Sequence, residues 1–87
     1  MSRTSQLFFN RRKIKVNVKP YGMIEKRIKG GTYELREGAK LRTILRKSGA
    51  SGLGIPLIYM IGGERVKPSR PLADGDEVKI LNIVGGG

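Results

Sequence analysis

Residues 13–19 alternate strictly between polar and apolar side chains, reading Lys-Ile-Lys-Val-Asn-Val-Lys. A period of two places Ile14, Val16 and Val18 on one side of a β-strand and the polar side chains on the other. Such a strand buries one face and leaves the other face in water, as in antiparallel sheets that are covered on one side only. The remaining chain must therefore supply a cover for one face of a sheet.

The rest of the sequence provides more strands and one short helix. Residues 32–36 alternate in the same way and are expected to pair antiparallel with the first strand, with Tyr33 and Leu35 inward. Residues 39–48 carry apolar side chains at helical spacing, and Gly49 is placed to end that helix in a left-handed conformation. Further strands are expected at residues 57–61, 65–67 and 77–84. Strands gathered around one helix predict an α+β fold.

Composition excludes several classes of function. The 87 residues suffice for one small domain with a thin core, and they include no Cys and no His. Thiolate nucleophiles, imidazole bases, disulfides and nearly all zinc or haem sites are thereby excluded. No carboxylate pair or nucleophile–base pair converges at a recognisable spacing, so no catalytic residue, metal site or bound cofactor is expected. We predict a soluble, cytoplasmic protein without a membrane partner, since no apolar stretch approaches the length of a leader or a membrane span.

The net charge of +11 lies entirely in the front half of the chain. Residues 1–47 hold fourteen of the 18 Lys and Arg and only three of the seven acidic residues, whereas residues 48–87 are balanced. A one-sided basic surface can attract nucleic acid or an acidic protein, although an ordinary solvated surface has the same composition. The candidate basic surface comprises Lys13, Lys15, Lys19, Lys26, Arg27, Lys29, Arg42, Arg46 and Lys47, with Tyr21 nearby.

Two of the expected strands are apolar on both faces, which is unusual for a sheet covered on one side. In the last strand, Val78 and Ile80 take the inward positions, and Leu81 and Ile83 fall on the outward ones. In residues 57–61, the open face carries either Leu57, Tyr59 and Ile61, or Ile58 and Met60. An exposed apolar patch marks a partner surface, unless a bulge changes the phase and buries Leu81. The predicted docking residues are Tyr59, Leu81 and Ile83.

The end of the chain resembles a known family. The run Asp74-Gly75-Asp76-Glu77-Val78, an apolar strand and terminal glycines resemble the ubiquitin-like sulfur carriers, namely the thiamine-biosynthesis sulfur carrier and the small subunit of molybdopterin synthase. The step Glu37-Gly38-Ala39 into the helix is a supporting match. The resemblance covers residues 13–87 and implies the β-grasp (ubiquitin-like) fold, a mixed sheet of four to five strands with one helix across one face. The implied parts are a flexible basic leader at 1–12, a β-grasp domain at 13–84 and a flexible glycine tail at 85–87.

The resemblance also implies a mechanism. In this family, a partner similar to the ubiquitin-activating enzymes uses ATP and magnesium to adenylate the C-terminal carboxylate, here that of Gly87. A sulfur donor then displaces AMP and leaves a thiocarboxylate, which a sulfur-accepting synthase uses for thiamine, molybdopterin or tRNA-thiolation biosynthesis. The tail residues Gly85 and Gly86 lack a β-carbon, which allows close approach of the backbone inside a narrow site. On this interpretation the chain is a co-substrate and not an enzyme.

Alternatives remain open at this stage. The same fold could serve as a basic module that binds RNA or DNA, or as a ubiquitin-like protein modifier, and the three glycines could be an unstructured end. The chain departs from the family in its strong basicity and in the absence of a good N-cap residue near Lys40. The VGGG ending favours the thiamine carrier, whereas the long connection from Pro20 to Gly31 favours the molybdopterin subunit. Neither the pathway nor the mature end, Gly86 or Gly87, follows from the sequence.

Overall fold

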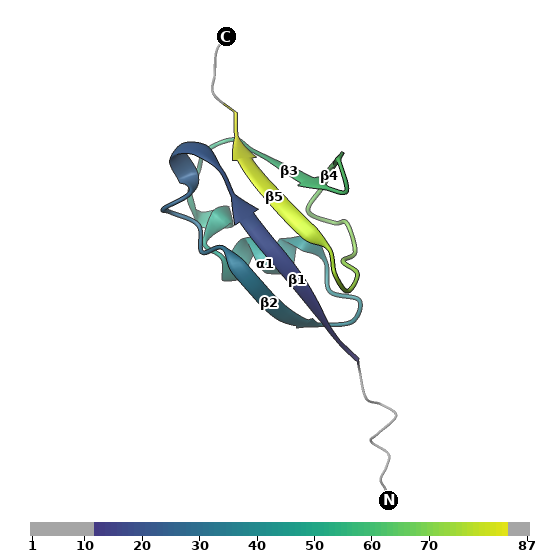
Figure 1. Cartoon of the computed structure of the whole chain (residues 1–87). Coiled ribbons are helices and arrows are strands. Elements are labelled where there is room, and N and C mark those ends of the chain that lie inside the picture. The colour runs from purple at the N-terminus through teal and green to yellow at the C-terminus, as the bar shows by residue number, and fades with distance from the viewer. Residues whose placement is uncertain (1–11, 84–87) are drawn as a thin grey trace, which may run out of the picture.

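The computed structural model describes residues 12–83 (Figure 1). The elements are β1 (Lys13–Pro20), η1 (Gly22–Ile24), β2 (Gly31–Arg36), α1 (Leu41–Lys47), η2 (Ala50–Gly52), β3 (Leu57–Ile61), β4 (Glu64–Val66) and β5 (Glu77–Asn82). Most of the predicted leader, together with Val84 and the predicted glycine tail 85–87, lies outside the described residues.

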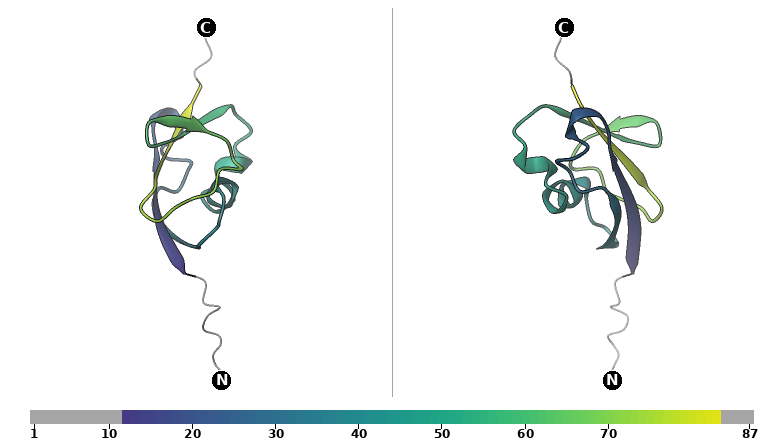
Figure 2. Two further views of the ribbon diagram at one scale, coloured as in Figure 1. Left: turned by 90° about the vertical axis from the view of Figure 1, so that its right-hand side faces the viewer. Right: turned by 60° about the vertical axis from the view of Figure 1, so that its left-hand side comes forward.

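The five strands form one mixed sheet in the order β2-β1-β5-β3-β4. The two central strands, β1 and β5, are parallel, and every other neighbouring pair is antiparallel. The helix α1 crosses one face of this sheet, as the side views in Figure 2 make plain. The predicted α+β architecture, with a four- to five-stranded mixed sheet and one helix across one face, is confirmed.

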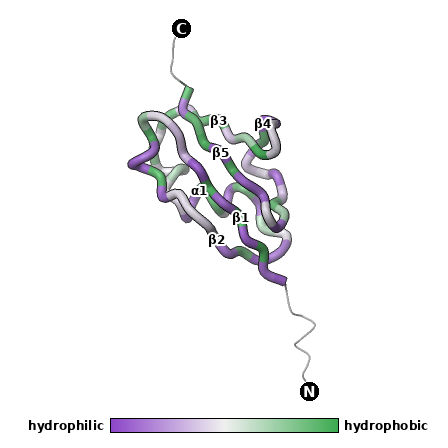
Figure 3. Tube along the Cα trace, in the orientation of Figure 1, coloured by the Kyte–Doolittle hydropathy of each residue, from purple (hydrophilic) through white to green (hydrophobic). Residues whose placement is uncertain are grey.

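The core lies between α1 and the covered face of the sheet. The predicted inward side chains of β1, Ile14, Val16 and Val18, are all buried, and Figure 3 shows the resulting alternation along that strand. The other buried apolar side chains are Ile24, Ile28, Leu35, Leu41, Ile44, Leu45, Ala50, Ile61, Leu72, Val78 and Ile80. Both central strands therefore contribute to the core along their whole paired length, which fixes the position of β5 in the middle of the molecule.

Backbone carbonyls of a neighbouring loop replace a side-chain cap at the start of α1. Lys40 occupies the N-cap position and makes no side-chain capping bond. Instead, the N–H groups of Leu41 and Arg42 donate to the carbonyl oxygens of Arg70 and Pro68, each at 2.9 Å. These bonds satisfy donors that a helix leaves unpaired in its first turn. At the other end, Gly49 has φ 88° and terminates α1 as predicted.

A polar turn sets the position of β5 beside β1. The N–H of Lys15 donates to Asp74 Oδ1 at 2.8 Å, and the N–H of Gly75 donates to the Lys15 carbonyl at 2.8 Å. Within the turn, the N–H of Ala73 donates to Asp76 Oδ2 at 2.8 Å, and Gly75 has φ 87°, which favours glycine. β5 therefore starts beside the middle of β1 and runs parallel to it, so it finishes at the far end of the molecule from Lys13.

Several element boundaries differ by one or two residues from the sequence prediction. β4 begins at Glu64 because the turn Gly62–Gly63 is completed within two residues, both with positive φ. β5 ends at Asn82, which lies opposite Leu57 at the start of β3, two residues before the predicted end. The segment after β1 contains a short 3₁₀ turn in which Ile24 is buried and Met23 is exposed.

Candidate functional site

The face of the sheet turned away from α1 carries a small apolar patch. Ile58 of β3 lies directly opposite Leu81 of β5, and Met60 lies opposite Lys79. Ile58, Met60 and Leu81, named here the open-face patch, are half-buried although no helix covers them. The pairing of β3 with β5 is continuous through Asn82, so no bulge changes the phase of Leu81. Leu81 therefore lies on the outward side, as predicted.

Tyr59 is on the opposite face, and its predicted place beside Leu81 was wrong. It pairs with Ile80, which is fully buried, and it packs against the edge of the core together with Leu57 and Val66. Burial raises the pKa of its phenol. An isolated strand that is apolar at every position carries no sign of which parity faces outward, so only the register with β5 distinguishes Tyr59 from Ile58.

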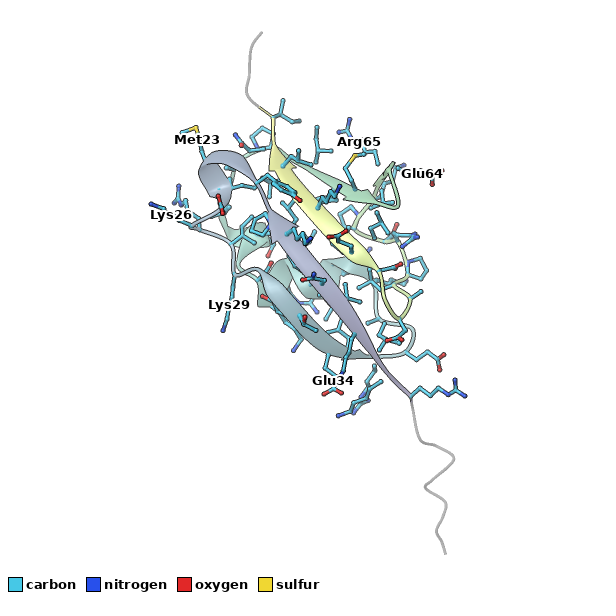
Figure 4. The ribbon with its side chains drawn as sticks, in the orientation of Figure 1. Met23, Lys26, Lys29, Glu34, Glu64 and Arg65 are labelled. Atoms are coloured by element: carbon cyan, nitrogen blue, oxygen red, sulfur yellow. The ribbon has the colours of Figure 1, made fainter. Side chains whose placement is uncertain are left out.

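Cations border the open-face patch. Lys79 lies between Met60 of β3 and Lys19 of β1, and Arg65 of β4 lies opposite Met60 (Figure 4). Lys19 Nζ is paired with Glu77 Oε2 at 2.6 Å. The hydrogen bond and the charge of Lys19 lower the pKa of Glu77, and the same two effects of Glu77 raise the pKa of Lys19. The patch thus combines an apolar centre with a basic margin, which suits an apolar partner surface that has acidic groups around it.

The root of the tail lies next to this patch. The N–H of Ile83 donates to the Pro56 carbonyl at 3.2 Å, which extends the β3–β5 pairing by one step. On the other side, the N–H of Tyr21 donates to the Ile80 carbonyl at 2.9 Å and extends the β1–β5 pairing. The predicted docking residue Ile83 is exposed there. The predicted reacting residue Gly87 and its neighbours Gly85 and Gly86 lie outside the described residues.

The nine candidate basic residues are all exposed, but they do not form one surface. Lys13, Lys15 and Lys19 alternate with the buried residues of β1 and so face away from α1. The other six belong to α1 or to the connection before β2, and they are Lys26, Arg27, Lys29, Arg42, Arg46 and Lys47. Among these, the 26–29 segment meets the end of α1, because the Lys29 N–H donates to the Ser48 carbonyl at 3.0 Å.

The described residues offer little for catalysis of their own. Within 12–83, no group of three or more His, Cys, Asp or Glu is placed to hold a metal ion. The same part of the chain has no helix that is long and apolar enough to cross a membrane. A hollow of about 620 Å³ beside the β3–β4 turn is lined in part by Arg70 and Asp76, which pair with each other at 3.3 Å and so serve the turn before β5.

A model of the ThiS family matches residues 24–87 of the sequence. The chain belongs to the ThiS family. It is a member of the ubiquitin-like sulfur carriers, as the resemblance of the Asp74–Val78 run and the terminal glycines predicted. The match covers β2 to β5 and continues through Gly87, but it leaves out β1 and the first residues of the connection after it.

Solved structures agree with this assignment. The chain is similar to subunit 1 or 2 in the protein–protein complex of molybdopterin-converting factor from Helicobacter pylori 26695, with 25% identity over 85% of this chain and 100% of that chain and a TM-score of 0.54. A ubiquitin from Caldiarchaeum subterraneum is 20% identical over 87% of this chain and 100% of that chain, with a TM-score of 0.53, and supports the fold. No curated protein matches the sequence. Family membership supports a sulfur-carrier role in general, and a carrier rather than an enzyme.

Sequence reasoning missed two neighbours of the tail root. Met23 and Ile55 are exposed beside the end of β5, although neither was proposed as a site residue. Their signal in the sequence is an absence of charge. In a chain with 29% charged residues, none occurs in residues 20–24, 48–63 or 80–87. The structure brings one part of each segment to the finish of β5, where the Tyr21 N–H donates to the Ile80 carbonyl and the Ile83 N–H donates to the Pro56 carbonyl.

Proposed function

We propose that the chain carries sulfur as a thiocarboxylate on the C-terminal carboxylate of Gly87. A carboxylate oxygen attacks the α-phosphorus of ATP, pyrophosphate leaves, and an acyl-adenylate forms. A donor equivalent to hydrosulfide then attacks the carbonyl carbon and AMP leaves, so that one terminal oxygen is replaced by sulfur. A partner similar to the ubiquitin-activating enzymes supplies the ATP site and the magnesium ion that neutralises phosphate charge. The chain itself is the co-substrate.

The observation that carries this proposal is the family match, which extends through the residue that bears the reacting carboxylate. The sequence after β5 also suits the task. Gly85, Gly86 and Gly87 have no β-carbon, so the backbone meets the least steric resistance in a narrow channel. A chain with few constraints loses about 1–2 kcal/mol of conformational free energy per residue on being ordered. A docking surface beside the tail is therefore required to offset that loss.

The open-face patch is the proposed docking surface. Leu81 lies two residues before Ile83, on the strand that continues directly into the tail. Burying the patch against a partner removes apolar surface from water, which contributes about 25 cal/mol per Å². Lys79 and Arg65 at its margin would meet acidic groups of the partner and orient the complex. Tyr59 is left out of this surface because it lies on the core side.

The sulfur acceptor is proposed to be a synthase of thiamine or molybdopterin biosynthesis, or an enzyme that thiolates a tRNA base. The Helicobacter pylori neighbour was solved as a complex of two subunits, which supports the proposal of a second protein that receives the tail. Transfer of the tail to a protein amine, as in a ubiquitin-like modifier, uses the same adenylate and is the alternative fate. We propose the cytoplasm as the compartment, because the first step consumes ATP.

Intact mass spectrometry tests the proposal directly. The full chain is incubated with its cognate adenylating enzyme, ATP, magnesium and a sulfur donor, and a mass gain equal to the exchange of one oxygen for sulfur is expected. A chain that lacks Gly87 provides the matched control. It should keep the same urea unfolding curve, because the deletion removes one glycine that has no side chain to pack, and it should show no mass gain. An unmodified mass for the full chain, or equal conversion of the shortened one, would overturn the proposal.

A second candidate function is binding of a polyanion such as RNA. The observation that favours it is the meeting of two basic segments at the end of α1, where the Lys29 N–H donates to the Ser48 carbonyl at 3.0 Å. This contact joins the segment that carries Lys26, Arg27 and Lys29 to the end of α1, which carries Arg46 and Lys47 and lies across the face of the sheet opposite the open-face patch (Figure 2). Within residues 12–83, the ion pairs are Lys19–Glu77 and Arg70–Asp76, so none of these five is paired there.

Salt dependence tests this second function. Binding of a single-stranded RNA to the full chain should weaken steeply between low and physiological salt, because each neutralised phosphate releases a counterion. The matched variants are Arg46→Glu with Lys47→Glu, and, on the sheet face, Lys13→Glu with Lys15→Glu. The helix pair should reduce affinity by about tenfold or more, and the strand pair should have the smaller effect. Absence of binding at low salt, or equal loss for both pairs, removes this candidate.

A further inference from the structure

The topology of the sheet surrounds the root of the tail with two other segments. β5 is a central strand, and β1 beside it is parallel, so the residues that follow β1 emerge at the same end. β3 on the other side is antiparallel, so the residues that precede it lie at that end too. The bonds from Tyr21 to Ile80 and from Ile83 to Pro56 hold both segments against β5. Anything that grips the tail at its root therefore meets three segments of the chain.

These segments expose apolar side chains. The large hydrophobic residues that are exposed within the described part of the chain are Tyr21, Met23, Ile55 and Ile83, at 41%, 82%, 38% and 43% exposure. All four lie at this one end, and we name them the tail collar. Met23 projects from the tip of the connection at the end of the molecule where β5 finishes (Figure 4). A cluster of this kind on a small domain is typical of a partner surface.

The short segments that hold the collar residues are uncharged, although Lys19 and Glu25 line a hollow together with Tyr21. No Lys, Arg, Asp or Glu occurs in residues 20–24, 53–58 and 80–83, which hold the four collar residues, whereas the chain as a whole carries a net charge of +11. The exposed large side chains of these segments are apolar, whereas charged side chains are common on the rest of the surface. The part of a partner that covers Met23, Ile55 and Ile83 is accordingly expected to be apolar, unlike an acidic surface that would match the basic parts of the molecule.

The length of the tail makes the contact unavoidable. Gly87 lies four residues beyond Ile83. A fully extended chain spans at most about 3.3–3.6 Å per residue, so the carboxylate reaches no further than about 14 Å from Ile83. A channel that encloses the carboxylate and an ATP molecule must therefore bring its mouth to the root of the tail. The walls of that mouth then lie over the residues that surround Ile83.

We infer that the tail collar seats on the mouth of the adenylating enzyme's carboxylate channel, and that Met23 and Ile55 are specificity-determining contacts there. The inference rests on the proposed function and adds to it the enzyme surface that receives the tail. It also extends beyond the open-face patch, because Met23 and Ile55 lie outside the strands. Met23 precedes the part of the chain that the family model matches, so this contact is one that the family pattern does not describe.

The test measures pyrophosphate exchange by the cognate adenylating enzyme with the full chain and its variants. Met23→Asp should raise the apparent KM for the carrier by about tenfold, since a carboxylate would face an apolar mouth, and Ile55→Asp should act in the same direction. The value of kcat should change by less than about twofold, because the carboxylate that reacts is unchanged. Met23→Leu and Ile55→Val are the matched controls and should retain the original KM. Met23→Asp and Met23→Leu should have the same urea unfolding curve, and so should Ile55→Asp and Ile55→Val, since Met23 and Ile55 are both exposed.

Each outcome separates this inference from the function on which it rests. If the unaltered chain supports no exchange, the proposed function fails. If the unaltered chain supports exchange, and Met23→Asp and Ile55→Asp show the same KM as that chain, the proposed function stands and the collar inference is overturned. A collar that serves a second copy of this chain would also overturn it. That case would appear in sedimentation velocity as a dimer of the unaltered chain that Met23→Asp converts to a monomer.

Discussion

The two ends of β5 are built in opposite ways. At its start, the Asp74–Asp76 turn is joined to β1 and to Ala73 by short hydrogen bonds through two carboxylates. At its finish, the strand emerges between uncharged segments with exposed apolar side chains. The polar groups at the start of β5 are hydrogen-bonded within the molecule and hold the strand in place. The apolar side chains at its finish are exposed and are available to a partner. The acidic run that most strongly suggested the family is thus architecture, and the proposed function lies at the other end.

The largest effect is expected from a charge placed near the finish of β5. Leu81→Asp should lower the efficiency of pyrophosphate exchange by about a hundredfold, or about 2.7 kcal/mol, because docking would bury an unpaired carboxylate. The free chain should lose about 1 kcal/mol of unfolding free energy at most, since Leu81 is half-buried against Ile58. Steady-state exchange kinetics and urea unfolding provide the two readouts.

Leu81→Met serves as the control for that experiment and should behave like the unaltered chain in both measurements. A Leu81→Asp chain that is activated normally would remove the open-face patch from the docking surface. A chain that is inactive because it is unfolded would be recognised from its unfolding curve, and Met60→Asp, one strand away on the same face, would then replace it.

A smaller effect is expected at the start of β5, where a substitution should change stability and leave activation unchanged. Asp76→Ala should lower the free energy of unfolding by about 1–3 kcal/mol, because the Ala73 N–H loses its acceptor and Arg70 loses its ion-pair partner. Activation of the folded chain should be unchanged, since this turn is at the far end from the tail. Urea unfolding and exchange kinetics at a temperature below the transition make the comparison.

Asp76→Asn is the matched control, because the amide oxygen still accepts the Ala73 N–H, and it should recover part of the stability. If Asp76→Ala instead lowered kcat without changing stability, the division of labour between the two ends of β5 would be wrong.

Much of this fold could be predicted from local patterns. The alternation in residues 13–19 fixed the inward face of β1, and Gly49 marked the end of α1, because both signals depend on nearby residues only. The first turn of α1 could not be predicted in the same way. Its donors are satisfied by the carbonyls of Pro68 and Arg70, which are distant in sequence, so the absence of a capping residue carried no information about stability.

Only part of the candidate site could be predicted, because some of its positions depend on strand pairing and not on local alternation. Leu81 follows the alternation of β5 and was placed on the outward face as expected. Tyr59 was placed on the wrong face because every residue of β3 is apolar, and its parity is set only by pairing with β5. Met23 and Ile55 come together through strand order, since one follows β1 and the other precedes β3. The sequence pattern within one segment does not predict that these two residues lie at the same end of β5.

The smallest expected effect concerns Glu77, the first residue of β5. Its pH dependence shows whether charge helps to hold the start of β5 in place. Its pKa is lowered from 4.5 by the hydrogen bond to Lys19, so its stabilising contribution is present above pH 4.5 and is lost as the pH falls through the lowered value. The pKa of Lys19 is raised from 10.5, so the same contribution is complete below pH 10.5 and is lost as the pH rises through the raised value.

Glu77→Gln should therefore be less stable than the unaltered chain between these limits, by the least of the changes considered, because both side chains are in water. The difference should shrink at high salt and disappear well below pH 4.5, where the carboxylate is protonated in both states. Urea unfolding across this pH range measures it. A difference that persists in acid would mean that Glu77 acts through packing rather than charge, and the polar end of β5 would then be held by more than its hydrogen bonds.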